Sequence, residues 1–440
     1  MAGSSSSSTA GEISGWVRLM RRLSVSMASF YCRSPALRAP RRINTMARFA
    51  ACAPARRMLP MPRSLSLLLL SLVCIALAAA AAPPATRHVP SDPPAAGGGE
   101  AAVAGTSHGE EDAEGLSLEA ERRLQLTVDA ATWLSLDVSP DGERLVLEIL
   151  GDLYLLPVAG GEAERLTEGM AFDSQPRFSP DGATLVFVSD RSGSENLWLL
   201  DLDDREPRQL SRENGKVEFA SPSWSPDGDH VVASRTFWGL NVFELWAYHR
   251  DGGKGLRITQ AKSNGSTPTA QRHNALGAVY DPSGRYLYYA RRNGGFTYNA
   301  EFPLWQVARR DLLNDAEDVL TQARGSAIRP QLSPDGRHLV YGTRFEHQTG
   351  LRIRDLDSGE DRWLVYPVQF DEQESRFTRD LLPGYAFTPD GEAVIYTAEG
   401  GIRRVDVTSG AVTAIPFTAR VDQGLGPRLY FPNRLGLGPG

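Results

Sequence analysis

The sequence has 440 residues, 41% of them hydrophobic, enough for one large domain or two ordinary ones with a buried core. Its formal charge of −6 divides into +10 for residues 1–63, which hold eleven arginines and one acid, and −16 for the rest. Such an acidic body argues against nucleic acid as a partner, because phosphate contacts need a basic face. All three cysteines, Cys32, Cys52 and Cys74, lie near the N-terminus, which excludes disulfides and cysteine-bound zinc from the remainder.

An apolar run is the first element along the chain. Ser64–Ala82 is rich in leucine and ends in alanines, and Arg56, Arg57 and Arg63 precede it. A basic segment, an apolar segment and small residues in that order are typical of a secretory signal. The pattern predicts a signal peptide at about 58–85 and a periplasmic or secreted protein.

The N-terminal extension and signal peptide together form the first predicted region, residues 1–82. Cleavage is expected to leave a mature N-terminus between Ala81 and Thr86. The alternative is an uncleaved anchor, since about 18 apolar residues can span a bilayer; this would be the chain's one contact with a membrane. Residues 83–118 are rich in Pro, Ala, Gly and Glu, a composition that cannot bury enough apolar area to fold, so they are predicted to be a disordered linker.

A turn tetrad then recurs six times at intervals of 40 to 56 residues, each copy followed by a β-branched or aromatic run. Pro presets the first corner of such a turn, Asp bonds its own backbone, and Gly accepts a positive φ. The copies are Ser139–Gly142, Ser179–Gly182, Ser225–Gly228, Asp281–Gly284, Ser333–Gly336 and Thr388–Gly391.

Other features recur in phase with the tetrad. A strand built around a large aromatic residue, such as Trp198, Trp246 or Trp305, precedes a short strand ending in Leu-Thr or a similar pair. A β-rich unit of about this period indicates a propeller. The sequence therefore predicts an all-β fold, a six-bladed β-propeller of four-stranded antiparallel blades over residues 119–425, followed by a tail at 426–440.

The sequence leaves open whether the six blades close into a ring by themselves. If the six blades close alone, Leu124–Thr127 is expected to pair beside the sixth blade, next to Ala414–Thr418 or in its place. If further blades follow residue 440, the sixth blade keeps a bare edge against the first. Six complete units are enough for a propeller, which favours closure.

The repeats resemble the PD40, or WD40-like, repeats of TolB-like propellers. A further resemblance, to the propeller region of exported amidohydrolases, covers most of residues 124–430. It implies a metal-dependent hydrolase domain after the propeller, whose ligands begin with a His-x-His pair; this sequence has no such pair, so that catalytic domain is absent here. The matching stretches are Trp133–Gly142, Leu150–Tyr154, Gly169–Pro176, Leu382–Gly391 and Ile415–Ala419.

The chain's own histidines and its one Gly-x-Ser-x-Gly match have non-catalytic interpretations. His230 and His338 occupy one interchangeable polar position of the blade and are interpreted as surface residues. The Gly-x-Ser-x-Gly match at Gly105–Gly109 lies in the linker, without the strand and helix that a nucleophile elbow needs. No catalytic, cofactor-binding or metal-binding residue is predicted, and no cofactor; whether the protein is an enzyme stays undecided.

The function predicted first is an exported, non-catalytic propeller that acts as a scaffold for a protein or peptide partner. The alternative is the propeller part of an amidohydrolase, or of a prolyl-oligopeptidase-like peptidase, with its catalytic domain beyond residue 440. Aromatic residues near the insertions of blades three and four are the predicted binding surface, since they fall out of phase with the packing positions. They are Phe237, Trp238, Phe296 and Tyr298.

Overall fold

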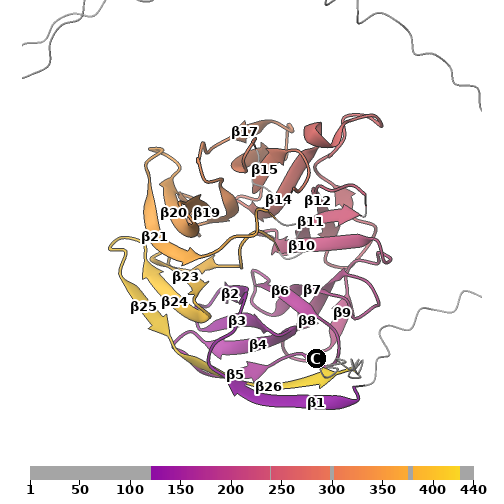
Figure 1. Cartoon of the computed structure of the whole chain (residues 1–440), viewed down its shortest axis with the longest axis vertical. Helices are drawn as coiled ribbons and strands as arrows, with labels where there is room; N and C mark the ends of the chain where they lie inside the picture. The colour runs from indigo at the N-terminus through magenta and orange to yellow at the C-terminus, as the bar shows by residue number, and fades with distance from the viewer. Residues whose placement is uncertain (1–119, 238, 298–301, 375–379, 427–440) are drawn as a thin grey trace, which may run out of the picture. The chain divides into compact units, whose positions relative to one another are not determined.

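Six β-sheets surround a central axis in the computed structural model, which describes residues 120–237, 239–297, 302–374 and 380–426 (Figure 1). Five sheets have four strands each, and the sixth has four strands plus two added at its outer edge. Neighbouring strands within each set of four are antiparallel and follow one another in sequence. The predicted six-bladed, four-stranded propeller is confirmed.

The strands of each blade run from the central axis outwards. Blades one to three consist of β2 (Leu136–Val138), β3 (Arg144–Ile149), β4 (Asp152–Pro157) and β5 (Gly161–Arg165); β6 (Asp173–Phe178), β7 (Thr184–Ser189), β8 (Asn196–Asp201) and β9 (Pro207–Gln209); β10 (Val217–Trp224), β11 (His230–Phe237), β12 (Glu244–His249) and β13 (Leu256–Arg257). Blades four to six consist of β14 (His273–Tyr280), β15 (Tyr286–Asn293), β16 (Gln306–Asp311) and β17 (Glu317–Val319); β18 (Ile328–Leu332), β19 (His338–Phe345), β20 (Gln348–Asp355) and β21 (Asp361–Gln369); β22 (Ala386–Phe387), β23 (Ala393–Ala398), β24 (Gly401–Asp406) and β25 (Val412–Ile415). The strands outside the blades are β1 (Arg122–Val128) and β26 (Phe417–Leu425), and the described helix is the 3-10 turn η1 (Thr269–Gln271).

Each tetrad forms the turn between the first and second strands of its blade. All six glycines have φ between 71° and 75°, as predicted. In the second blade Gly182 N donates to Ser179 O at 2.8 Å, and Ser179 Oγ donates to Asp181 Oδ1 at 2.5 Å. The same hydroxyl accepts from Thr184 N at 3.0 Å, so it links the turn to the first residue of the next strand. Because Asp181 accepts from Ser179 and from the Ala183 backbone, its pKa lies below the usual value.

The tetrads also touch one another. A β-carbon placed on each tetrad glycine would lie 3.1 to 3.8 Å from a proline carbon of the preceding blade's tetrad. The same proximity is found between all neighbouring blades around the ring. Between blade six and blade one, a β-carbon added at Gly142 would lie 3.4 Å from Pro389. The tetrads of neighbouring blades therefore lie close together around the ring, including blade six against blade one.

The Leu-Thr pairs after the short fourth strand bind the third strand. Thr167 Oγ1 accepts from Leu153 N at 3.0 Å, and Thr259 Oγ1 accepts from Leu245 N at 2.8 Å. Ser211 and Thr321 make the same bond in blades two and four. A side-chain hydroxyl thus supplies the hydrogen bond that the short outer strand cannot, which explains why this pair recurs.

Apolar side chains fill the space between blades. One cluster joins β2, β3 and β4 of blade one to β22, β23 and β24 of blade six and contains Leu136, Tyr154, Ile395 and Ile402, all 1% exposed or less. The first and sixth blades are therefore packed face to face, and the ring of six is closed in this structure.

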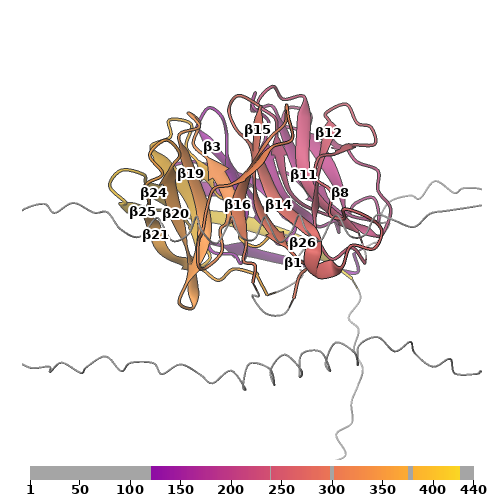
Figure 2. The ribbon, with the colours of Figure 1, turned by 90° about the horizontal axis from the view of Figure 1, so that it is seen from above.

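The strand predicted to close the ring has a different partner from the one expected. β1 pairs antiparallel with β26, so that Leu126 lies opposite Val421, and β26 runs parallel to β5 at the outer edge of blade one (Figures 1 and 2). The predicted pairing of Leu124–Thr127 beside Ala414–Thr418 is wrong. The sixth blade already has its fourth strand in β25, which ends at Ile415.

The change of blade occurs at Pro416. Its carbonyl accepts from Gly161 N at 2.9 Å, and a β-carbon on Gly160 would lie only 2.2 Å from the same oxygen. With φ of 88° and 125°, Gly160 and Gly161 also need the freedom of glycine. The turn before β5 is thus shaped to receive the strand that arrives from blade six.

Some sequence predictions concern regions outside the described residues. These are the signal peptide, the linker up to residue 118, and the tail apart from Gly426. Within the described part of the chain, no helix is long and apolar enough to cross a membrane.

The register of β1 can be tested by crosslinking. Gln125 and Asp422 are directly opposite on β1 and β26, and Gln125 Nε2 donates to Asp422 Oδ2 at 3.0 Å. We expect Gln125→Cys with Asp422→Cys, in a chain lacking its three native cysteines, to oxidise to an intramolecular crosslink. The control pair, Leu126→Cys with Ile415→Cys, should stay reduced. Crosslinking of the control pair alone, read by a gel shift, would contradict the observed register.

Candidate functional site

The first strand of each blade lines the central channel, and four of these strands carry a β-bulge. The register of β6, β10, β14 and β18 shifts four residues before the tetrad. The first bulge residue has a left-handed backbone in every case, with φ between 51° and 68°. Bulges re-aim side chains, and here they turn a polar set towards the axis. The bulge residues are Gln175, Ser221, Gly277 and Arg329.

A buried polar network joins three of these positions. Arg329 Nη1 donates to Asp380 Oδ2 at 2.5 Å, and Ser221 Oγ binds the same carboxylate. Gln175 Oε1 accepts from Ser221 N at 2.7 Å. A β-carbon on Gly277 would come within 2.8 Å of Asp380 Oδ2, so only glycine fits there. Residues from blades two, three and five therefore meet the segment that follows β21, and the side chains of Arg329 and Asp380 are 2% and 1% exposed.

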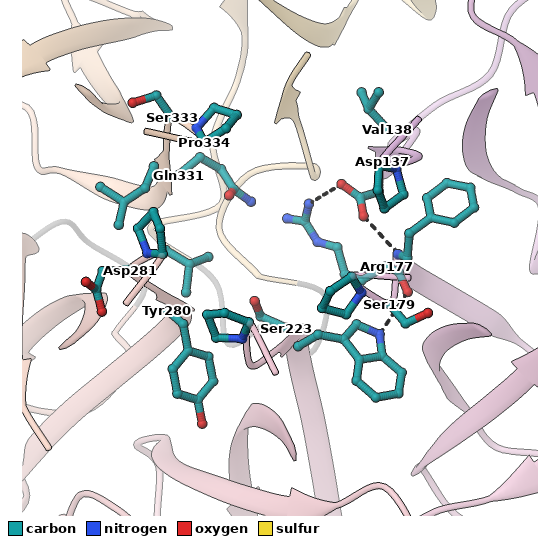
Figure 3. Close-up of a pocket in the computed structure, with 18 residues that line it drawn as sticks. Asp137, Val138, Arg177, Ser179, Ser223, Tyr280, Asp281, Gln331, Ser333 and Pro334 are labelled. Atoms are coloured by element: carbon teal, nitrogen blue, oxygen red, sulfur yellow. Dashed lines mark hydrogen bonds and ion pairs between the residues drawn. The ribbon is translucent and has the colours of Figure 1, made fainter. Parts of the chain in front are cut away.

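Two residues further along each strand, the channel opens into a cavity of about 320 Å³ on the side of the turns. We call this cavity the turn-side mouth. Figure 3 shows polar side chains from several blades pointing into it, among them Asp137, Arg177, Ser223 and Gln331. Its rim is formed by tetrad prolines, namely Pro140, Pro180, Pro226, Pro282 and Pro334.

Arg177 is the central charged group of the turn-side mouth. Its Nη1 donates to Asp137 Oδ1 at 3.0 Å, while Asp137 Oδ2 accepts from Phe178 N at 2.9 Å (Figure 3). With its amide oriented to accept, Gln331 places an oxygen 2.6 Å from Arg177 Nη2. The two charged side chains are 9% and 14% exposed. This arrangement holds the nearly buried guanidinium in one orientation at the wall of the mouth.

The electrostatics of the mouth favour binding over acid–base chemistry. Burial lowers the pKa of Arg177 and Asp137 opposes that shift, but a guanidinium stays protonated at neutral pH. Burial also raises the pKa of Tyr280 to about 12, so its phenol is neutral and can donate a hydrogen bond. Figure 3 shows the Tyr280 hydroxyl pointing away from Arg177, so the lining offers a fixed cation, the Ser223 hydroxyl and apolar proline rings.

The aromatic residues predicted as a binding surface are not brought together by the described structure. Phe237 is 43% exposed at the end of β11. Phe296 is 8% exposed and packs on Phe243 and Trp305, with ring centroids 5.9 Å away in both cases, so it belongs to the core. Trp238 and Tyr298 lie outside the described residues.

Sequence reasoning missed the turn-side mouth. The signal was present, because a polar residue stands two positions before the tetrad in Asp137, Arg177, Ser223 and Gln331. A second signal was the X-Pro pair that marks the bulge in three blades, at Gln175–Pro176, for example. Read in phase with the repeat, these positions point into the channel.

The rim of blade four carries a charged cluster around Glu317. Arg291 Nε lies 2.7 Å from Glu317 Oε1, His273 Nε2 lies 3.4 Å from Oε2, and Tyr289 Oη donates to Oε2. Burial alone would raise the pKa of this carboxyl, but the three partners outweigh burial and hold it at about 2. The carboxylate therefore stabilises the fold above its ordinary pKa of 4.5, and this contribution is lost as the pH falls from 4.5 to 2.

The repeats are similar to a known protein family and to several known proteins. The profile of the TolB β-propeller domain family, PD40, matches residues 117–295. An uncharacterized protein of Agrobacterium fabrum is 28% identical over 236 residues, which cover 50% of this chain and 72% of that protein. The Tol-Pal system protein TolB of Gluconobacter oxydans is 28% identical over 193 residues, 34% of this chain and 40% of TolB.

Among solved structures, TolB from Acinetobacter baumannii aligns with a TM-score of 0.49 and 18% identity over 65% of each chain. The chain spans less than half the length of the Gluconobacter TolB that it matches. The profile and the relatives together support a TolB-like PD40 propeller domain.

We expect Glu317→Gln to lower the free energy of unfolding at pH 7 by about 1–3 kcal/mol, because Gln cannot replace the carboxylate between His273 and Arg291. The loss should shrink as the pH falls from about 4.5 to about 2. Urea denaturation over this range measures it. Asp318→Asn is the control, since Asp318 is on the same strand and its side chain is 64% exposed. A pH-independent loss would contradict the assignment.

The Arg177–Asp137 pair gives a second expectation. Arg177→Met leaves the Asp137 carboxylate without its cation in a nearly buried site and should cost about 2–4 kcal/mol. Adding Asp137→Asn removes the stranded charge and should restore at least about 1 kcal/mol of that loss. A double-mutant cycle by urea denaturation measures this coupling, and strictly additive effects would show that the pair does not interact.

Proposed function

We propose that this protein is an exported, non-catalytic binding module whose turn-side mouth receives an extended segment of a partner protein. The observation that carries the proposal is a pre-formed cavity with a fixed guanidinium at its centre and proline rings at its rim. Concave sites with few well-placed polar groups and apolar walls are the usual places for ligands.

The rigidity of the mouth supports this proposal. Prolines have no side-chain rotamers to lose, and the tetrads that carry them are hydrogen-bonded internally and touch the neighbouring tetrad. Binding there costs little ordering entropy. Arg177, held by Asp137 and Gln331, presents a planar donor suited to a carboxylate or an amide oxygen. The partner segment is therefore expected to insert an acidic or amide side chain.

Export is the second component of the proposal. It rests on the basic and apolar pattern of residues 58–85 and on the similarity to a Tol-Pal system protein. N-terminal sequencing of the protein from its source cell should begin between Ala81 and Thr86. A cytosolic protein that retains Ser64–Ala82 would contradict export without affecting the binding proposal.

Selection from a displayed library of random dodecapeptides tests binding at the mouth. We expect enriched peptides to contain Asp, Glu, Asn or Gln and to lose at least about tenfold in affinity on Ser223→Trp, which fills the cavity. Ser266→Trp is the matched control, because Ser266 is exposed and is not one of the residues that line the mouth. Enriched peptides that bind both variants equally would overturn the proposed site, and hydrolysis of the bound peptides would overturn the non-catalytic role.

A further inference from the structure

Blade five differs from the other blades in its outer strand. β21 has nine residues, whereas the fourth strands of the other blades have two to five. No strand pairs with the outer edge of β21 among the residues that the structure describes. An open edge is a template for another strand, and natural proteins normally shorten or cover such edges or interrupt them with proline and bulges. In β21 two register shifts and Pro367 interrupt the ladder, and its regular part is Asp361–Trp363. In this molecule β26 covers β5, but β21 stays open (Figure 1).

An exposed aromatic cluster lies at this edge. The rings of Trp363 and Tyr366 on β21 and of Phe345 at the end of β19 have centroids 5.2 to 6.1 Å apart. The three residues are 37%, 37% and 53% exposed. A β-carbon on Gly350 would lie 2.8 Å from the Tyr366 ring and 3.0 Å from the Trp363 ring, so glycine lets both rings lie against β20. Phe370, 66% exposed, extends the apolar surface beyond the strand end.

A cationic cavity of about 390 Å³ adjoins the Trp363 end of β21. Arg352 stacks its guanidinium 5.0 Å from the Trp363 ring centroid, and its Nε lies 2.6 Å from Asp361 Oδ1. Arg324 is exposed and has no ion pair within the described part of the chain. The cavity is lined by four arginines, Arg324, Arg344, Arg352 and Arg354, and by one acid, Asp361.

The net charge of this cavity is small and positive. Arg344 is paired with Asp371 and Glu374, which lie behind the lining, and Arg354 Nη1 is 3.6 Å from Asp361. Four cations against these three acids leave a single positive charge, on a chain whose residues from 64 onwards are strongly acidic. The residual charge matches one carboxylate better than a doubly charged phosphate.

A second cavity, of about 510 Å³, lies at the other end of β21, between blades five and six. Its lining is largely apolar and includes Tyr366, Val368 and Phe370 from the β21 segment, with Tyr396 and Val412 from blade six. The open backbone of β21 therefore runs between a cationic cavity and an apolar one.

We propose that the β21 edge is a second binding surface, which takes an extended segment of a partner protein as an added strand. Backbone hydrogen bonds to β21 supply affinity, and side chains supply specificity, as in other cases of strand addition. One Asp or Glu of the segment enters the cavity near Arg324, and an aromatic or aliphatic residue enters the cavity near Phe370. Trp363 lines the first cavity and Phe370 the second, seven positions further along the chain, so the two anchors are expected about seven residues apart in the segment. This surface is independent of the turn-side mouth.

The test is a second selection from the displayed dodecapeptide library, on the full chain carrying Ser223→Trp so that the mouth is blocked. We expect enriched peptides to alternate β-branched or aromatic residues, with an acid about seven positions from an apolar anchor. Resynthesised peptides should bind at least about tenfold more weakly to Arg324→Glu and to Phe370→Lys. Both positions are exposed, so these variants should fold.

Matched variants control for charge and hydrophobicity. Lys254→Glu repeats the charge reversal, and Leu313→Lys repeats the apolar-to-lysine change at a residue 78% exposed. Neither should alter peptide binding. Proline in the centre of the peptide should abolish binding, because it removes a backbone donor and cannot join the ladder. Slower amide exchange over Asp361–Tyr366 in the complex should report the added strand directly.

Three results would overturn the proposal. One is the absence of peptides that depend on both Arg324 and Phe370. Another is binding that survives the central proline without protection of β21, which would indicate side-chain contacts alone. The third is self-association of the wild-type chain, seen by sedimentation equilibrium and abolished by Phe370→Lys, which would make the occupant a second copy of this chain.

Discussion

The contact between each tetrad proline and the next tetrad glycine is the constraint on which the rest of this structure depends. A propeller blade cannot bury both of its faces alone, so neighbouring blades must meet at a fixed distance. Here that distance is set near the axis, where the position of a glycine β-carbon is 3.1 to 3.8 Å from a proline carbon of the preceding blade in all six cases. A larger residue at any of these glycines would have an unfavourable positive φ, and at Gly336 it would also be crowded by Pro282.

The turn-side mouth follows from the same contacts. Five of the six tetrad prolines line the cavity, and so do the residues two positions before those five tetrads. In four of these blades the position carries a polar residue, namely Asp137, Arg177, Ser223 or Gln331, whereas in blade four it carries the apolar Val279. Further in, bulges bring Ser221 and Arg329 to Asp380, where a buried and hydrogen-bonded network fills the channel. The packing of the ring and the chemistry of the mouth thus share one sequence motif.

Much of the fold could be predicted from the sequence because turn chemistry is local. Pro, Asp and Gly in fixed order specify the turn wherever they occur, and six repetitions specify the blades. The partner of β1 could not be predicted, because Leu124–Thr127 fits any open strand edge. Its choice of β26 depends on Pro416 meeting Gly160 and Gly161 of another blade.

The candidate sites were harder to predict than the fold. Phe296 is an aromatic residue near an insertion, as a surface anchor would be, but it packs beside Phe243 and Trp305. This tertiary contact cannot be read from the local sequence. The length of β21 and the open state of its edge depend likewise on where neighbouring chain segments run. Arg177, by contrast, stands at a fixed offset from the tetrad, so its position in the channel was accessible from the repeat itself.

A double-mutant cycle between Pro389 and Gly142 tests ring closure by these contacts most directly, because the two residues are 247 positions apart in sequence and meet only if blade six packs on blade one. Pro140→Ala with Gly182→Ala is the reference cycle, since a β-carbon added at Gly182 would lie 3.4 Å from Pro140, the same distance as a β-carbon at Gly142 from Pro389. Closure predicts coupling of about 0.5–1.5 kcal/mol in both cycles, measured by urea denaturation. Coupling in the reference cycle with none between Pro389 and Gly142 would contradict it.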